Sequence, residues 1–200
     1  MITPKYKSIG VMCGSSDACP SHFHELAREV GRTLGRHGHD IVYGGGARGL
    51  MREVADGAME EGAHVTGYMP TFMVEVEWQH KGLARLEITK DMSERKQKMM
   101  RDSNATLFLP GGCGTMEEFF EWLSAKRLGK HLGPLIIVNH QGYYDPLIQL
   151  LNNMQQEAFH NPVHERMWQS ISAPEEIAQA LNDAHPWDAS YIKQAASVKS

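Results

Sequence analysis

The sequence predicts an α/β fold of the Rossmann-like, doubly wound type, in which a parallel sheet carries helices on both faces. Short apolar runs alternate with amphipathic segments along most of the 200 residues, and this alternation is typical of β-α-β units. Three of the apolar runs end in glycine- or serine-rich turns, at Gly14, Gly44 and Gly111. Because ligands of such sheets bind beyond the carboxyl ends of the strands, we expect these turns to meet at one binding edge.

Length and composition fit one domain over residues 1–200, large enough to bury about 70% of its unfolded surface. The net charge of −4, from 20 basic and 24 acidic residues, argues against nucleic acid as a partner. The three cysteines show no CxxC spacing, which predicts reduced thiols and a cytoplasmic protein. The N-terminus lacks the apolar region of a signal peptide, and no apolar run is long enough for a membrane span, so we expect no membrane partner.

The first half of the chain is expected to supply three strands and two helices. Short apolar segments bounded by turn residues are predicted strands; they are residues 8–13, 40–43 and 64–69. Segments with apolar residues at helical spacing are predicted helices; they are residues 20–37 and 49–61. Residues 71–82, which include Glu77 and Trp78, have no clear period. We therefore expect a long functional loop there.

The second half repeats the alternation. Its predicted strands are residues 86–89, 105–109 and, as the last strand, 135–138. Its predicted helices are residues 91–101, a helix after the Gly111 turn, 145–156 and 174–182. The segment after His185 is polar, and we expect it to be loose.

Residues 104–121 join a buried strand, a glycine-rich turn and a helix. The turn is Pro110-Gly-Gly-Cys-Gly-Thr115, and the helix after it has apolar residues at i, i+3, i+4 and i+7. Glycines let backbone N–H groups approach a bound anion, and the first turn of a helix adds unpaired donors and partial positive charge. The order of these elements therefore predicts a phosphate cradle.

Glu117 and Glu118 lie just inside this helix. The helix dipole favours a carboxylate at that place, but a carboxylate would repel a phosphate bound too near. Each residue is therefore either an ordinary helix-start residue or a catalytic group that faces the next part of the ligand.

The second turn offers an alternative ligand. Gly44, Gly46 and Gly49 match the GxGxxG fingerprint of dinucleotide binding and follow a predicted strand. The fingerprint also requires an acidic residue at the end of the next strand, and that strand ends HVTGYMP without one. The pattern lies on the second strand rather than the first, so the sequence argues against a nicotinamide cofactor.

The motifs together resemble those of the Lonely Guy (LOG) family. PGGCGTMEE fits the family's PGGxGTxxE motif, and MSERKQKM in the preceding helix fits its M-x-x-RK-x-x-M element. The turns CGSS and YGGGARGLM and the later GYYDPLI also match, so the resemblance covers nearly the whole chain. Proteins of this kind are phosphoribohydrolases that cut the N-glycosidic bond of cytokinin riboside 5′-monophosphates, and often of AMP. Many members carry an older label, lysine decarboxylase, which this sequence does not support because it shows no pyridoxal-phosphate lysine motif. We therefore expect no cofactor, and we also expect no metal.

The resemblance implies roles for particular residues. Glu118 is the carboxylate near C1′ that stabilises positive charge on the ribose or activates water, and Arg95 is the second catalytic residue. Arg95 can also clamp the substrate and hold the carboxylate ionised. The expected substrate-binding residues are Gly14, Ser15, Gly45, Glu77, Arg95, Lys96, Gly111, Gly112, Cys113, Gly114, Thr115, Glu117 and Ser124.

A different class of function shares the predicted fold. Molybdenum-cofactor carriers have the same phosphate turn and bind without catalysis, and fold alone does not separate the two classes. The Arg95–Glu118 pair favours the enzyme, because a carrier does not require it. Taken singly, Arg95 and Lys96 also fit a solvated helix face, and Cys113 fits a filler in the turn.

The chain departs from the family at three places. Arg52 replaces a glycine, Ser124-Ala125 replaces a Thr-Trp pair, and Arg127 replaces a glutamine. Ser124 keeps a hydroxyl, whereas the loss of the tryptophan bears on the fit of a prenylated adenine.

The resemblance also implies a homodimer with the active sites near the interface. The helix after the glycine turn has more apolar side chains, at Phe119, Phe120, Trp122 and Leu123, than one face needs. We expect Trp122 to anchor the interface, unless it packs inside its own subunit.

Overall fold

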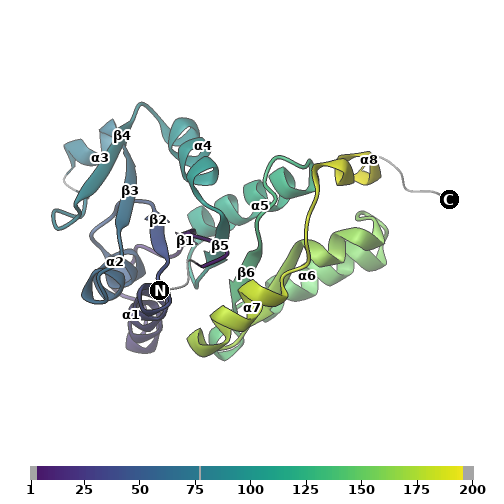
Figure 1. Cartoon of the computed structure of the whole chain (residues 1–200), viewed down its shortest axis with the longest axis horizontal. Coiled ribbons are helices and arrows are strands. Elements are labelled where there is room, and N and C mark those ends of the chain that lie inside the picture. Colours follow the sequence, from purple (N-terminus) through teal and green to yellow (C-terminus); the bar gives the residue numbers. More distant parts are fainter. Residues whose placement is uncertain (1–3, 77, 196–200) are drawn as a thin grey trace.

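A computed structural model describes residues 4–76 and 78–195 (Figure 1). It contains a seven-stranded sheet in the order β4-β3-β2-β1-β5-β6-β7, and all neighbouring strands are parallel. The predicted α/β class with a parallel sheet is therefore confirmed. The strands are β1 Ser8–Met12, β2 Asp40–Tyr43, β3 Val65–Pro70, β4 Arg85–Thr89, β5 Ala105–Phe108, β6 Leu135–Val138 and β7 Trp168–Ile171.

Helices cover both faces of this sheet. The α-helices are α1 Ser21–Arg36, α2 Gly49–Glu60, α3 Thr71–Glu75, α4 Met92–Asp102, α5 Cys113–Arg127, α6 Asp145–Gln156, α7 Ile177–Asp183 and α8 Ile192–Ala195. Shorter 3-10 turns are His140–Gly142, Pro162–Met167, Pro174–Glu176 and Ala189–Tyr191. Among the described residues, no helix is both long enough and apolar enough to cross a membrane.

The two faces carry separate hydrophobic cores, because side chains alternate between the faces along each strand. Ile41 and Tyr43 of β2 belong to the core with α1, α2 and α7. Val42 belongs to the core with α4, α5 and α6. The order of strands reverses between β1 and β5, so the loops after these two strands diverge and leave a crevice at the carboxyl edge of the sheet.

Three expectations about the elements were wrong. Residues 135–138 are not the last strand, because β7 pairs with β6 at the edge of the sheet; its sequence WQSI is too polar to stand out as an apolar run. Residues 71–75 form the short helix α3, which is too short to show a helical period. The segment after His185 is not loose at Trp187, whose side chain is buried and whose indole N–H donates to the Lys126 carbonyl at 2.7 Å; residues 196–200, which the same expectation included, lie outside the described residues.

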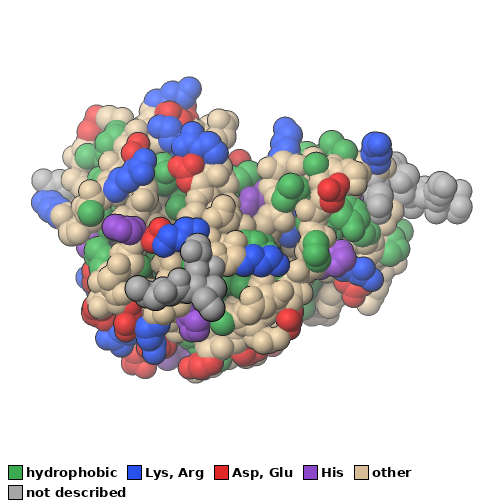
Figure 2. Space-filling view, in the orientation of Figure 1, with side chains coloured by type: hydrophobic (Ala, Val, Ile, Leu, Met, Phe, Trp, Pro, Cys, Tyr) green, Lys and Arg blue, Asp and Glu red, His purple; other side chains and the backbone are tan. Residues whose placement is uncertain are grey.

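The expectation that Trp122 anchors a dimer interface was also wrong, because this residue is 0% exposed within its own chain. Phe119 and Leu123 are also buried, in the core on the α4–α6 face. Phe120 is partly buried against the same core, so most of the apolar surplus of α5 is covered within the chain. On the face shown in Figure 2, basic and acidic side chains are interspersed.

Candidate functional site

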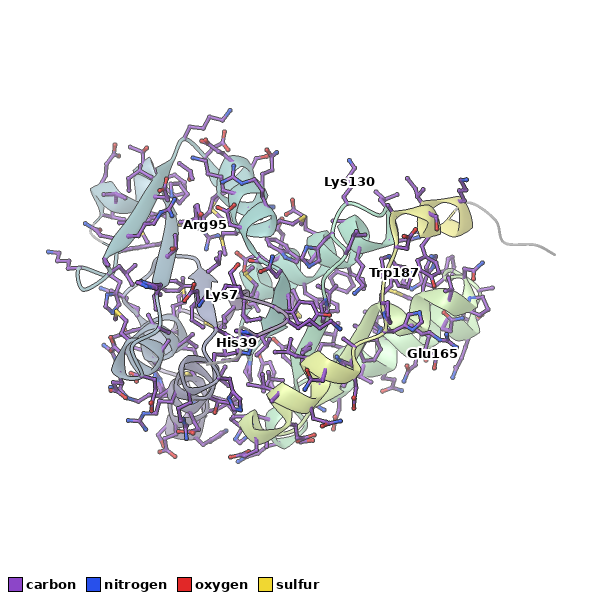
Figure 3. The ribbon with its side chains drawn as sticks, viewed as in Figure 1. Lys7, His39, Arg95, Lys130, Glu165 and Trp187 are labelled. Atoms are coloured by element: carbon purple, nitrogen blue, oxygen red, sulfur yellow. The ribbon has the colours of Figure 1, made fainter. Side chains whose placement is uncertain are left out.

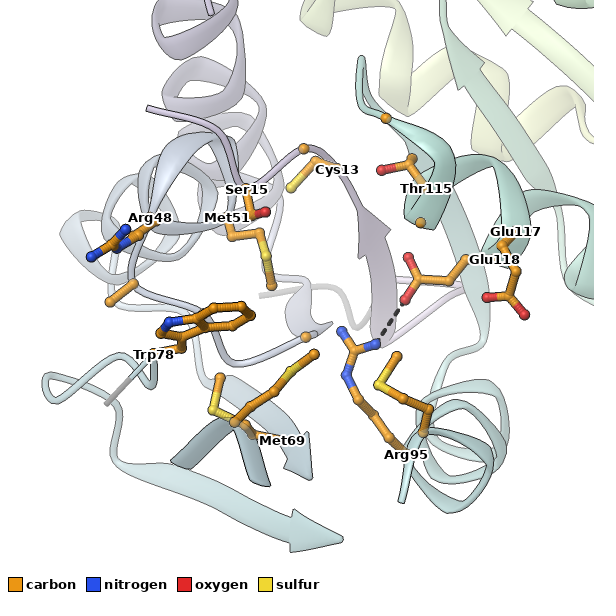
Figure 4. A pocket seen from close by; sticks show the side chains of 18 residues that line it. Cys13, Ser15, Arg48, Met51, Met69, Trp78, Arg95, Thr115, Glu117 and Glu118 are labelled. Carbon is orange, nitrogen blue, oxygen red and sulfur yellow. Dashed lines mark hydrogen bonds and ion pairs between the residues drawn. The ribbon is translucent and has the colours of Figure 1, made fainter. Parts of the chain in front are cut away.

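A pocket of about 330 Å³ lies at the carboxyl ends of β1, β2, β3 and β5, where α4 and α5 approach the sheet (Figure 4). We call it the main pocket. Its wall consists of Cys13, Gly14, Ser15, Gly44, Gly46, Ala47, Arg48, Met51, Met69, Met73, Trp78, Met92, Arg95, Gly112, Gly114, Thr115, Glu117 and Glu118. Three turns that are far apart in the sequence thus meet at one edge of the sheet.

The glycine turn before α5 forms one end of the main pocket. Gly112 is the N-cap of α5, and no side chain caps the helix start. A Cβ atom on Gly111 would lie 2.1 Å from the Thr115 hydroxyl oxygen and 2.8 Å from the Gly14 backbone nitrogen, so only glycine allows the turn to close this tightly. The helix start, with its partial positive charge, is therefore exposed to the pocket and suits an anionic group.

Arg95 reaches the pocket from α4, and its side chain is almost fully buried. Its Nε donates to the Tyr68 carbonyl at 2.9 Å, which fixes the guanidinium beside the end of β3. A Cβ atom on Gly44 would lie 1.9 Å from Arg95 Nη2. The glycine at the end of β2, part of the pattern that resembles a dinucleotide fingerprint, thus makes room for this guanidinium.

Glu118 meets Arg95 from the other side, on α5 (Figure 4). Arg95 Nη1 donates to Glu118 Oε1 at 3.0 Å, and each residue is 7% exposed. Burial raises the pKa of Glu118 above its ordinary value, and the Arg95 guanidinium opposes this shift. The ion pair thus fixes the Glu118 carboxylate in a buried region of low dielectric constant. Such an environment shifts the pKa of a carboxyl group, as is common at catalytic sites.

Glu117 and Lys96 lie at the rim of the pair. Glu117 lines the main pocket, and its side chain is half exposed. Lys96 forms ion pairs with Glu117 and Glu121 of α5. Lys96 is therefore placed to hold α4 against α5, and it is not part of the pocket wall.

The structure brings together some of the expected site residues and separates others. Of the expected residues, Gly14, Ser15, Arg95, Gly112, Gly114, Thr115, Glu117 and Glu118 line the main pocket. Gly111 lines an adjoining cavity together with Gly14 and Tyr143. Cys113 is exposed at the start of α5, outside the wall, whereas Gly45 is buried and is not part of the wall.

Ser124 is separated from the expected site residues that line the main pocket. It lies six residues beyond Glu118, which is about 9 Å along the helix axis, and its side chain is exposed outside the main pocket. Helical periodicity turns it away from the face that carries Glu118. Glu77 lies outside the described residues.

Several wall residues are absent from the expected site residues, namely Arg48, Met51, Met69, Met73, Met92 and Trp78, of which only Trp78 lies in the segment expected to be a functional loop. Trp78 stands across the pocket from Glu118 in Figure 4. The Trp78 carbonyl accepts from the Ala47 N–H at 2.9 Å, and the His80 N–H donates to the Gly45 carbonyl at 2.8 Å. These bonds fasten residues 78–80 to the glycine turn after β2. The signal in the sequence that could have pointed to Trp78 as a wall residue is a tryptophan in a polar segment that shows no helical or strand periodicity.

Comparisons with known proteins identify the family of the chain. The family model described as "Possible lysine decarboxylase" matches residues 51–181, more than half of the chain. The cytokinin riboside 5′-monophosphate phosphoribohydrolase LOG1 of Arabidopsis thaliana is 33% identical over 92% of this chain and 87% of its own length. The cytokinin riboside 5′-monophosphate phosphoribohydrolase of Rhodococcoides fascians is 38% identical over 80% of this chain and 81% of its own length.

Solved structures show a similar fold at lower identity. The molybdenum cofactor carrier protein of Chlamydomonas reinhardtii superposes with a TM-score of 0.68 at 20% identity, covering 92% of this chain and 98% of its own. At that identity the likeness shows the fold alone. Sequence relatives, motifs and fold agree, and the chain belongs to the LOG family, whose family model carries the description "Possible lysine decarboxylase".

Proposed function

We propose that this protein hydrolyses the N-glycosidic bond of purine riboside 5′-monophosphates, including AMP and cytokinin nucleotides, to give the free base and ribose 5-phosphate. The observation that carries the proposal is the buried Arg95–Glu118 ion pair, which stands in one pocket with the uncapped start of α5. Relatives named as phosphoribohydrolases at 32–38% identity support it.

The chemistry assigns a role to each end of the pocket. Backbone N–H groups at the start of α5, with the Thr115 hydroxyl, bind the 5′-phosphate and fix the ribose. As the bond from C1′ to the base nitrogen breaks, positive charge develops on the ribose, and the Glu118 carboxylate stabilises it. Glu118 accepts a proton from the water that attacks C1′, and this proton is passed on to the departing base nitrogen, so that Glu118 is ionised again. Arg95 keeps Glu118 ionised and oriented.

The 5′-phosphate is expected to decide whether a nucleoside is a substrate. We expect cleavage of AMP, with kcat/KM for adenosine at least about 100-fold lower, since two hydrogen bonds to a charged group contribute about 1.5–3 kcal/mol each. Free adenine, the product common to both reactions, is measured by chromatography after incubation with either compound. Equal kcat/KM values for AMP and adenosine would remove the phosphate cradle from the mechanism.

The same assay separates the enzyme from a binding protein of similar fold. A molybdenum-cofactor carrier does not need the Arg95–Glu118 pair, and the structural likeness to carriers is at 20% identity. AMP that stays intact in the presence of micromolar protein would favour the carrier class.

Trp78 is expected to stack on the base. Its indole lines the main pocket near Met51 and Met69, and 48% of the residue is exposed, so one face is open to a ligand. Because stacking of a base on an aromatic side chain contributes about 1–3 kcal/mol, Trp78→Ala is expected to lower kcat/KM for AMP by about 10-fold, mainly through KM. Trp78→Phe is expected to keep most of the activity.

Phe72→Ala is the matched control for Trp78, because Phe72 is a half-exposed aromatic residue of α3 outside the pocket wall. It is expected to leave both kinetic constants unchanged. An unaltered KM in Trp78→Ala would show that the base binds elsewhere in the pocket.

We also propose that the protein is a cytoplasmic homodimer. Cys13, Cys19 and Cys113 are unpaired, as in a reducing compartment. Exposed apolar side chains at Leu128 and Leu132, after α5, and at Leu150 and Phe159, on and after α6, are candidates for the interface. Light scattering is expected to give twice 22.4 kDa or a multiple of that dimer. A fully active monomer at micromolar concentration would contradict this.

A further inference from the structure

Lys126 is a buried cation far from the main pocket. It lies in the last turn of α5, and its residue is 1% exposed. Its Nζ donates to the Gly133 carbonyl at 2.6 Å and lies 5.7 Å from the centre of the Trp187 ring. Within residues 4–76 and 78–195, Lys126 forms no ion pair with a carboxylate.

The surroundings of Lys126 do not neutralise it. Burial lowers the pKa of Lys126 to about 8, so the ammonium remains mostly protonated at neutral pH. His131 is buried next to it, and burial together with Lys126 lowers the pKa of His131 to about 4, which leaves the imidazole neutral. A buried ammonium with one carbonyl acceptor retains N–H donors and an uncompensated charge.

Lys126 lines a cavity of about 180 Å³; we call it the Lys126 cavity. Arg166, Asp183 and His185 also line it, with the Arg166 and Asp183 side chains exposed toward solvent. Asp183 Oδ2 already accepts a hydrogen bond from the Gln179 amide at 2.6 Å. The wall therefore has an excess of basic groups and one carboxylate that is already hydrogen-bonded.

The Lys126 cavity lies at the edge of the sheet opposite to the main pocket. Leu135 and Trp168, the first residues of β6 and β7, are in its wall, whereas the main pocket lies at the carboxyl ends of the strands. Figure 3 shows Trp187 and Arg95 well apart. The cavity is thus separate from the proposed active site, although α5 runs between them with Glu118 near one end and Lys126 near the other.

We propose that the Lys126 cavity binds a small oxyanion of phosphate size, either free phosphate or the phosphate group of a monoester. The ammonium of Lys126 supplies the buried charge, and the planar guanidinium of Arg166 matches two oxygens of such a group. The volume exceeds that of a single halide ion and accommodates a tetrahedral oxyanion. This inference does not depend on the proposed hydrolysis.

The indole N–H signals of the four tryptophans provide separate reporters for the two sites. Trp168 lines the Lys126 cavity, and the Trp187 indole N–H donates to the Lys126 carbonyl. Trp78 lines the main pocket and reports phosphate bound there. Protein labelled with ¹⁵N at tryptophan is titrated with inorganic phosphate, against sodium chloride at the same ionic strength. Saturable shifts of the Trp168 or Trp187 signal, with their own binding curve, are expected.

Three variants test the assignment. Lys126→Met is expected to abolish the shifts of Trp168 and Trp187 and to leave any shift of Trp78 in place. Lys130→Met removes an exposed lysine close by in the chain (Figure 3) and is expected to change neither curve. If Lys126→Met fails to fold, Arg166→Met serves instead, because Arg166 is exposed; a loss of affinity of about 10-fold or more is expected for one charge-assisted contact.

A parallel titration with ribose 5-phosphate identifies the source of the oxyanion, because the compound that saturates Trp168 and Trp187 at the lower concentration is the preferred form. Trp168 and Trp187 signals that stay fixed with both compounds would overturn the proposal. So would shifts that persist unchanged in Lys126→Met, or in Arg166→Met where that variant replaces it.

Discussion

Glu118→Gln is expected to lower kcat for AMP by about 10²–10⁴-fold while KM changes little. The amide has the shape of the carboxylate, and its oxygen still accepts the hydrogen bond from Arg95 Nη1 that Glu118 accepts at 3.0 Å. It lacks the negative charge that faces the developing ribose cation, and it does not take a proton from water. The glycine turn and Thr115 are untouched, so the nucleotide still binds. Initial rates of adenine release over a range of AMP concentrations give both constants.

Glu121→Gln is the matched control for this variant. Glu121 lies on the same helix and pairs with Lys96, outside the wall of the main pocket. It is expected to keep at least half of the wild-type kcat. If Glu118→Gln releases adenine as fast as the wild type, Glu118 is an ordinary residue of the helix start and the proposed mechanism is wrong.

Arg95→Met is expected to lower kcat/KM by about 10²–10³-fold, the usual cost of losing one fixed electrostatic donor in an active site. It also changes the pH profile. Burial raises the pKa of Glu118 above 4.5 and Arg95 lowers it, so without Arg95 this pKa rises further. Since the ionised carboxylate is the active form, activity is lost as the pH falls through this pKa. The acid limb of kcat/KM therefore moves to higher pH in the variant.

Arg101→Met controls for the loss of an arginine from α4, because Arg101 is exposed and pairs with Asp102 outside the pocket. It is expected to keep the wild-type profile. An acid limb at the same pH in Arg95→Met and in the wild type would show that Arg95 does not act through Glu118. Far-ultraviolet circular dichroism of both variants confirms that the fold is retained.

The sequence by itself determined the elements whose signal is local. The run 105–109, the glycine turn and the apolar stripe of α5 predict strand, turn and helix without reference to the rest of the chain. The RK and PGGxGTxxE motifs singled out Arg95 and Glu118 through their resemblance to the LOG family, and the structure places both residues in the wall of the main pocket. The convergence of the Gly14, Gly44 and Gly111 turns also followed, since parallel strands bring their carboxyl ends to one edge.

Tertiary structure decided what depends on contacts between distant segments. The 3.0 Å hydrogen bond from Arg95 to Glu118 requires α4 and α5 to approach each other at the carboxyl edge of the sheet. The space for the guanidinium comes from Gly44, which follows β2. Trp78 enters the pocket because its segment bonds to the turn after β2, which no local pattern records.

The same reason explains the wrong expectations. Trp122 looked available for a partner because helical spacing shows how many apolar residues a helix has, whereas burial depends on how many neighbours cover it. The position of Ser124 outside the main pocket could likewise not be predicted from its motif, because the direction of its side chain is set by the helix phase relative to the sheet. The strand β7 and the buried Trp187 are held by β6 and by the end of α5, and those contacts do not exist until the chain has folded.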